Sequence, residues 1–360
     1  MEVDAAIQGQ KHNILKKLNI CLSKKALIIL FNCLLLTIGQ IGGPLLVRIY
    51  FLNGGKRKWL TSWLLTAGFP CLILPISISY AKTRAKLSAS KFLVTPRLFV
   101  ASAILGCLLG IDSYLYTFGM SYLPVSVSSL LGSSQLAFTS IFAYFVVKHK
   151  FTHYSINAVV LMTFGSVVLG LHMNGDRPSG ESNANYTLGF FMTLAGAALH
   201  GFIMPALEFA FKKAEVVVTF DLVLQVQFLV SMFATMFCTI PMIINKDFQA
   251  IPKEAAEFEL GPMKYYMILG VAAMALQCMM IGSIGVIFST SSLFGGILTS
   301  LLVPVQQILA VICLTESFSG EKGMALAMCL WGFASYFYGQ YKVNQKQPDV
   351  RQDQPEHEEV

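Results

Sequence analysis

Charged residues are scarce in this chain of 360 residues: Asp, Glu, Lys and Arg make up 12% of it, whereas hydrophobic residues make up 55%. A soluble domain carries about 25% charged residues, so the composition excludes a soluble globule. Ten apolar runs fill nearly all of the sequence. Each has roughly 20 residues, enough to cross a hydrocarbon core about 30 Å thick as a helix. Because a backbone in lipid must satisfy its own hydrogen bonds, we predict an all-α integral membrane protein.

Motifs of catalysis and metal binding are also missing. The eight cysteines form no CxxC pair, and most lie inside apolar runs, which is typical of small apolar side chains. The sequence has no HExxH, no Gly-rich phosphate loop and no dinucleotide-binding GxGxxG. Asp112 has no close acidic partner in its helix, and no nucleophile is evident near His200. We therefore expect no enzyme, no cofactor and no metal site.

The basic residues gather in loops and tails, so the net charge of +7 does not indicate a nucleic-acid partner. With the N-terminus inside, most Lys and Arg residues fall on the cytosolic side, although Lys56-Arg57-Lys58 falls outside. The positive-inside rule then predicts that both termini are cytosolic. We expect a multi-pass protein of the plasma membrane, although no sorting signal excludes an internal membrane. The predicted spans lie near residues 26–50, 59–80, 98–118, 125–147, 154–173, 187–210, 219–243, 264–287, 291–313 and 323–341.

A weak internal repeat suggests two halves of five spans. Ser128-Ser129-Leu130-Leu131-Gly132 in the fourth span resembles Ser291-Ser292-Leu293-Phe294-Gly295 in the ninth, and Lys150-Phe151-Thr152 corresponds to Ser317-Phe318-Ser319. An odd number of spans per half inserts the second copy upside down, as in many transporters. We predict ten transmembrane helices in a 5+5 inverted repeat. The predicted parts are a cytosolic tail 1–25, a first repeat 26–173, a loop 174–186, a second repeat 187–341 and a disordered cytosolic tail 342–360.

Prolines interrupt equivalent helices. Pro44 in the first span and Pro205 in the sixth each remove a backbone donor, and Pro304 does so in the ninth. Such paired interruptions are typical of transporter sites, and a packing kink is the alternative. We predict that these three prolines act as hinges.

Polar side chains lie near the middle of six of the apolar runs, where insertion into lipid is unfavourable by on the order of 1–3 kcal/mol each. They are Gln40, Asp112, Gln135, His200, Gln277 and the pair Gln306-Gln307. One such residue alone is equally well explained as a contact between helices. Six helices that each offer one at similar depth favour a lined cavity. Glu208 lies nearer the cytosolic end and could gate the path or pair with a loop lysine, and Arg48 is expected to extend toward the membrane surface.

Aromatic side chains accompany this polar layer. Tyr116 lies one turn from Asp112, and Phe138 follows Gln135 by three positions. A glutamine amide offers a donor and an acceptor side by side, which matches the edge of adenine. Aromatic rings stack on flat bases. The layer lacks the Lys/Arg cluster that a phosphate would need, so it suits a planar, neutral nitrogen heterocycle.

At these residues the sequence resembles the plant purine permeases of the drug/metabolite transporter superfamily. The similarity covers about residues 30–340. The strings that carry it include Gly43-Pro44-Leu45-Leu46, Asn53-Gly54-Gly55, Asp112-Ser113-Tyr114-Leu115-Tyr116, Ser133-Ser134-Gln135-Leu136-Ala137-Phe138, Asn245-Lys246-Asp247-Phe248, Glu321-Lys322-Gly323 and Leu330-Trp331-Gly332-Phe333. The resemblance implies a five-plus-five repeat with a cavity between the halves. It also implies uptake of adenine-like compounds, including cytokinins and related heterocycles.

The chain departs from this pattern in its acids. The run Val303-Pro304-Val305-Gln306-Gln307 lacks the family's frequent glutamate, and Gln225 and Gln227 stand where another is frequent early in the seventh span. His200 stands where tyrosine is common. Proton coupling therefore rests on Asp112 and Glu208 as candidates.

Our hypothesis is a carrier that moves a purine-type base across the lipid bilayer by alternating access, with or without protons. The substrate-binding candidates are Gln40, Asp112, Tyr116, Gln135, Phe138, His200 and Gln277. Two alternatives remain: a non-transporting membrane receptor or assembly subunit that binds a heterocycle, and a carrier for another class of metabolite. The preferred heterocycle, the oligomeric state and glycosylation at Asn185 stay open.

Overall fold

A computed structural model describes residues 2–77, 94–148, 152–171, 182–215, 219–290 and 292–346. Every regular element in these residues is helical. The elements are α1 (Glu2–Leu52), α2 (Lys58–Thr66), η1 (Phe69–Leu72), α4 (Pro96–Tyr122), α5 (Val125–Ser133), α6 (Gln135–Phe142), η2 (Ala143–Val147), α7 (His153–Leu171), α8 (Asn183–Ala214), α9 (Phe220–Ile244), α10 (Asp247–Glu257), α11 (Pro262–Ser289), α12 (Ser292–Leu314) and α13 (Gly320–Lys346).

Seven helical segments of the described chain are long and apolar enough to cross a membrane. They are Ala26–Leu52, Lys58–Ser77, Pro96–Tyr122, Val125–Val147, Asn183–Ala214, Asp221–Ile244 and Pro262–Ile287. Two shorter apolar helices, His153–Leu169 and Leu301–Leu314, fall on further predicted runs, and α13 covers the last one. The prediction of an all-α, multi-pass membrane protein is confirmed, and the count of ten spans stays a prediction.

The helices extend past several predicted boundaries. α8 begins at Asn183, inside the predicted loop 174–186, and α13 continues to Lys346, so the start of the predicted disordered tail 342–360 is helical. The helix that was expected at 26–50 is continuous from Glu2 to Leu52, so part of the predicted N-terminal tail is helical. In addition, α10 forms within the connector between the seventh and eighth predicted spans, where no helix was expected. Its sequence is too polar for a span, and it buries Asp247 and Glu254 against the bundle. Most of the predicted loop 174–186 and the end of the tail 342–360 lie outside the described residues.

Two apolar runs are broken, and neither break falls at a predicted hinge. The second run divides around Gly68, between α2 and η1. The fourth divides at Ser134, between α5 and α6. By contrast, the helix assignment continues through Pro44, Pro205 and Pro304 without interruption. The role of these prolines as hinges stays a prediction.

Helices distant in the sequence cross closely. The largest contacts join α1 with α11, α4 with α8, α7 with α13 and α4 with α9. Small residues make the first crossing possible, because a Cβ added at Gly39 would lie only 2.3 Å from the backbone nitrogen of Met279. Close backbone contact at glycine is a common way for helices to associate in lipid.

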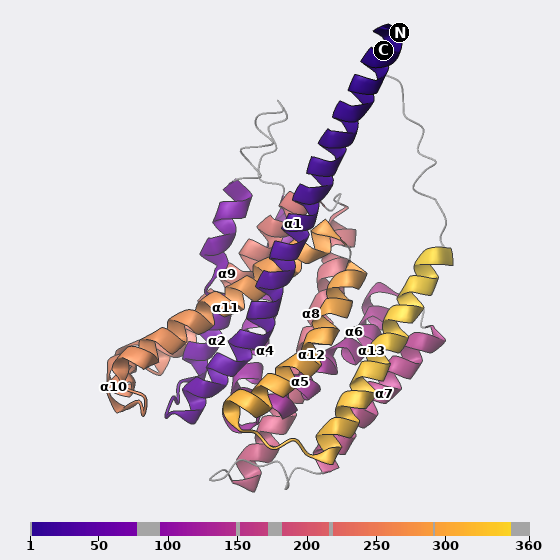
Figure 1. Ribbon diagram of the computed structural model, residues 1–360. Coiled ribbons are helices and arrows are strands. Elements are labelled where there is room, and N and C mark those ends of the chain that lie inside the picture. The colour runs from indigo at the N-terminus through magenta and orange to yellow at the C-terminus, as the bar shows by residue number, and fades with distance from the viewer. Residues whose placement is uncertain are drawn as a thin grey trace.

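The chain therefore forms a bundle whose helices run up and down (Figure 1). At one end, drawn at the lower left and bottom of Figure 1, lie α10 and the connectors 53–57 and 315–319. The α4–α5 turn at 123–124 lies at the same end, because Glu316 accepts from the backbone nitrogens of Val125 and Ser126. We call this end of the bundle the α10 end. The N-terminal part of α1 projects from the opposite end.

Candidate functional site

A polar contact in the interior of the bundle joins Asp112 of α4 to His200 of α8. The Nδ1 atom of His200 lies 2.7 Å from Oδ2 of Asp112. Asp112 is 7% exposed, whereas the His200 side chain is 26% exposed. Both residues were predicted as site residues because they interrupt apolar helices, and the structure brings them into direct contact.

At two glycines of α8, neighbouring helices come close to the Asp112–His200 pair and bring further predicted site residues near it. A Cβ at Gly196 would lie 3.6 Å from Oδ1 of Asp112 and 3.6 Å from the backbone nitrogen of Tyr116. A Cβ at Gly201 would lie 2.7 Å from Cβ of Phe138, and 3.0 Å from the carbonyl oxygen of Gln135. The helices α4 and α6 therefore approach α8 on either side of His200. Five of the predicted site residues gather along this stretch of α8.

A second polar group in the interior is the amide of Gln277 in α11. The amide covers Gly68, because a Cβ at Gly68 would lie 1.5 Å from Cδ of Gln277. The Nε2 atom of Gln277 is buried and has no hydrogen-bond partner in the described part of the chain. A buried donor without an acceptor is unfavourable by about 1–3 kcal/mol. Within the described residues, the Nε2 donor of Gln277 therefore stays available to a further acceptor.

Gln40 lies at the α1–α11 crossing. It is half-buried and follows Gly39, which contacts the backbone of Ala275 and Met279. Tyr116 of α4 packs against an apolar cluster that includes Val47 of α1 and Leu276 of α11. Through this cluster α4, which also crosses α8, packs against α1 and α11.

Two other polar candidates make contacts of a more structural kind. The Nε2 atom of Gln307 donates to the carbonyl oxygen of Ser126 at 2.7 Å and to Oγ of Ser129 at 2.6 Å, which ties α12 to α5. Glu208 forms an ion pair of 3.0 Å with Lys212 on the same helix, and both side chains are largely exposed. Of the two alternatives for Glu208, a gate or a pair with a loop lysine, the structure shows a lysine pair, although Lys212 lies within α8 and not in a loop.

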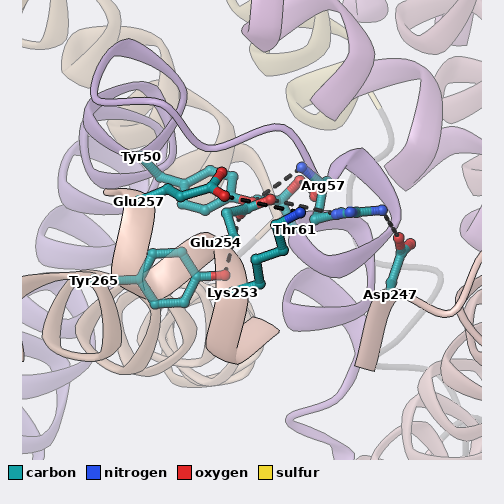
Figure 2. A network of polar contacts seen from close by, with 8 residues as sticks. All are labelled: Tyr50, Arg57, Thr61, Asp247, Lys253, Glu254, Glu257 and Tyr265. Carbon is teal, nitrogen blue, oxygen red and sulfur yellow. Dashed lines mark hydrogen bonds and ion pairs between the residues drawn. The ribbon is translucent and has the colours of Figure 1, made fainter. Parts of the chain in front are cut away.

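Sequence analysis missed a charged cluster at the α10 end (Figure 2). Arg57 places Nη1 2.8 Å from Oδ1 of Asp247, and Nε 3.4 Å from Oε2 of Glu254. Glu254 also accepts hydrogen bonds from the hydroxyls of Tyr50 and Tyr265. The cluster joins α1, α10 and α11 to the connector that precedes α2. The only signal in the sequence was an unexplained basic run on the predicted outer side.

Arg48 contradicts the expectation that it extends toward the membrane surface. It is 3% exposed, and its Nη1 atom donates to the carbonyl oxygens of Met120 and Ser121, both at 2.9 Å. These carbonyls belong to the end of α4, where the helix dipole favours a positive charge. Arg48 thus holds α4 against α1.

The interior side chains can form hydrogen bonds and offer flat rings for stacking. Amide, imidazole, carboxylate and phenol groups can donate to and accept from the edge of a polar heterocycle, and the rings of Tyr116 and Phe138 offer flat faces. The described residues contain no group of three His, Cys, Asp or Glu side chains that could hold a metal ion.

Comparisons with known proteins agree with this picture. A family model described as "Purine nucleobase transmembrane transport" matches residues 27–346. Purine permease 3 of Arabidopsis thaliana is 47% identical over 334 residues, which cover 92% of this chain and 95% of the relative. Purine permease 2 of the same plant is 43% identical, covering 89% and 94%, and probable purine permease 5 is 36% identical, covering 88% and 87%. The chain therefore belongs to the purine permease family, whose members are membrane transporters of purine nucleobases and not enzymes.

Proposed function

We propose that this protein carries purine nucleobases and related planar heterocycles, including cytokinins, across a membrane by alternating access. The observation that carries the proposal is the Asp112–His200 pair, which holds a carboxylate and an imidazole at 2.7 Å in the interior of an apolar bundle. Groups of this kind are unfavourable in lipid and usually serve a substrate or ion path. Because His200 keeps about a quarter of its surface open, its ring can still reach a ligand.

The neighbouring side chains suit a purine. Gln135 and Gln40 would each offer an amide fork to the ring nitrogens, and Gln277 would use its unpartnered Nε2 donor. Tyr116 and Phe138 would stack on the faces of the ring. Cytokinins share this purine ring, so the same contacts apply to them.

Proton coupling, if the carrier uses it, would involve the same pair. A proton shared between Asp112 and His200 would change the charge of the site when substrate enters or leaves, and a membrane interior amplifies such a change. Glu208 is the weaker candidate, because its carboxylate is exposed and already paired with Lys212.

We infer that the chain comprises two inverted halves, 26–173 and 187–341, each with five spans. The packing supports this assignment. In the repeat, α1 is equivalent to α8, and α4 is equivalent to α11. The α1–α11 crossing is therefore equivalent to the α4–α8 crossing, and both are large contacts. Gln40 and His200 precede Pro44 and Pro205 by about one turn, so the two halves place polar groups and prolines alike.

The orientation follows from charge. We propose that both termini face the cytosol, that the α10 end faces outward and that the protein resides in the plasma membrane. Pro44, Pro205 and Pro304 would allow their helices to bend between states.

Uptake by purified protein in liposomes tests the function. We expect labelled adenine to enter, unlabelled cytokinin bases to compete, and nucleotides to have no effect. Replacing Gln135 by Ala should raise the KM for adenine about tenfold, equivalent to the loss of one hydrogen bond of about 1.4 kcal/mol. Gln249→Ala on the exposed face of α10 is the matched control and should leave uptake unchanged.

The outcome separates the candidates. Saturable binding of adenine without flux would favour a receptor instead of a carrier. Uptake by Gln135→Ala at the original KM would remove Gln135 from the site. An imposed pH gradient that leaves the initial rate unchanged would exclude proton coupling.

A further inference from the structure

The α4–α5 turn is held on both sides by charges from distant parts of the chain. We propose that Glu316 and Gln307 latch α5 to α12 and thereby close the α10 end of the transport path, so that this end opens only when the latch releases. The proposal rests on the alternating-access function proposed above.

Glu316 caps α5 from outside the helix. Its Oε1 atom accepts from the backbone nitrogen of Val125 at 2.7 Å, and its Oε2 atom accepts from the backbone nitrogen of Ser126 at 3.0 Å and from Oγ of Ser126 at 2.6 Å. The N-cap residue of α5 is Pro124, whose side chain cannot accept a hydrogen bond, and none caps this helix locally. A carboxylate at a helix N-terminus is favoured by the helix dipole and makes strong, charge-assisted hydrogen bonds. Moving α12 away from α5 would therefore strip α5 of its cap.

Gln307 makes a second tie deeper in the same contact. Its amide reaches the carbonyl oxygen of Ser126 and the hydroxyl of Ser129. Gln307 is 1% exposed and Ser126 is fully buried. The α5–α12 contact is therefore dry and tightly bonded at the α10 end, as a closed gate must be.

Arg48 fixes the other side of the turn. It binds the last carbonyls of α4, while Glu316 binds the first amides of α5. The turn at 123–124 thus lies between a cation from α1 and an anion that follows α12. Arg48 anchors the α4 side of the turn, so we expect the α10 end to open by loss of the Glu316 contact with α5.

Of the fourth apolar run, α12 packs extensively only against the first part in the described residues. α12 packs against α5, but the described residues show no extensive packing of α12 against α6, which continues the same apolar run beyond Ser134. The two halves also differ in sequence here. In the repeat, Ser317 corresponds to Lys150, so Glu316 corresponds to His149. The first half therefore has no carboxylate at the equivalent position. A latch that exists at one end only is what distinguishes the two states of an alternating carrier.

Accessibility of a cysteine in the contact tests the latch. Ser129→Cys places a thiol beside Gln307, and a membrane-impermeant maleimide added from outside reports how often the α10 end opens. Adding Glu316→Gln should speed labelling about tenfold, a shift of about 1.4 kcal/mol in the opening equilibrium. The matched control, Glu257→Gln, removes the same charge from an exposed position of α10 and should leave the rate unchanged.

Cross-linking gives a second, independent measurement. A disulfide between Ser129→Cys and Gln307→Cys should stop uptake, and a reductant should restore it. Labelling that is equally slow with Glu316→Gln in a protein that elutes as folded would overturn the latch, as would full uptake by the cross-linked protein. Because labelling requires no substrate, a wrong assignment of the transported compound leaves this test intact.

Discussion

Replacing Arg57 by Ala should destabilise the protein, because the carboxylates of Asp247 and Glu254 would lose the cation that they contact. The guanidinium lies 2.8 Å from Asp247 and 3.4 Å from Glu254. The side chains of these two acids are only 4% and 9% exposed, so water cannot replace Arg57 freely. Burial lowers the pKa of Arg57, but the hydrogen bond and charge of Asp247, together with the charge of Glu254, outweigh it and raise the pKa above its ordinary value. Arg57 is therefore charged at every pH at which the protein is used.

The magnitude follows from burial. Removing one partner of a buried ion pair is unfavourable by about 3–5 kcal/mol. The Arg57 side chain is 35% exposed, however, and solvent screens its half of the interaction. We therefore expect a loss of about 2 kcal/mol in the free energy of unfolding, which corresponds to a fall of about 3 °C in the unfolding midpoint of a chain of this length.

Thermal unfolding of the purified protein in detergent measures this effect. Arg57→Lys should be intermediate, because lysine keeps the charge but cannot reach two carboxylates with one planar group. The double variant Arg57→Ala with Asp247→Asn should be more stable than Arg57→Ala alone, since it no longer leaves that carboxylate unpaired. Lys253→Ala breaks only an exposed pair with Glu257 and serves as the control. A midpoint for Arg57→Ala equal to that of the control would refute the reasoning.

Two further predictions concern the interior. Gly68→Ala should push the amide of Gln277 aside and raise the KM for adenine, as Gln277→Ala does. The control is Gly132→Ala, at a position with open space around it, which should leave the KM unchanged. Equal KM values for the two glycine variants would count against a role of Gln277 in binding. Asp112→Asn removes the charge next to His200, so any stimulation of uptake by an imposed pH gradient should disappear. A retained response would mean that the pair carries no proton.

Hydrophobic run length was sufficient to predict the helices, because lipid leaves a spanning backbone few alternatives. It could not predict α10, since the run 247–257 is polar and becomes helical by packing charged side chains against the bundle. The breaks at Gly68 and Ser134 were likewise missed. A proline predicts a lost hydrogen bond, yet neighbouring helices can support a continuous helix around it, as they do at Pro44.

The candidate site was predictable in its residues but not in its pairs. Asp112 and His200 stand out in the sequence because charge is rare in apolar helices, but 88 positions separate them, and only the α4–α8 crossing shows that they meet. Arg57 and Glu316 were missed for the opposite reason. They lie in connectors, where charge is ordinary, and their importance comes from partners that are 190 and 191 residues away.

The α1–α11 crossing has a consequence for biosynthesis. α1 leaves the ribosome early, but the glycines on its inner face, including Gly39, find their partner only after residues 262–289 have been made. During that interval the narrow groove on α1 is uncovered in the bilayer, and α4 waits likewise for α8. The N-terminal segments thus acquire their native neighbours only late in synthesis, so we expect maturation to depend on completing translation.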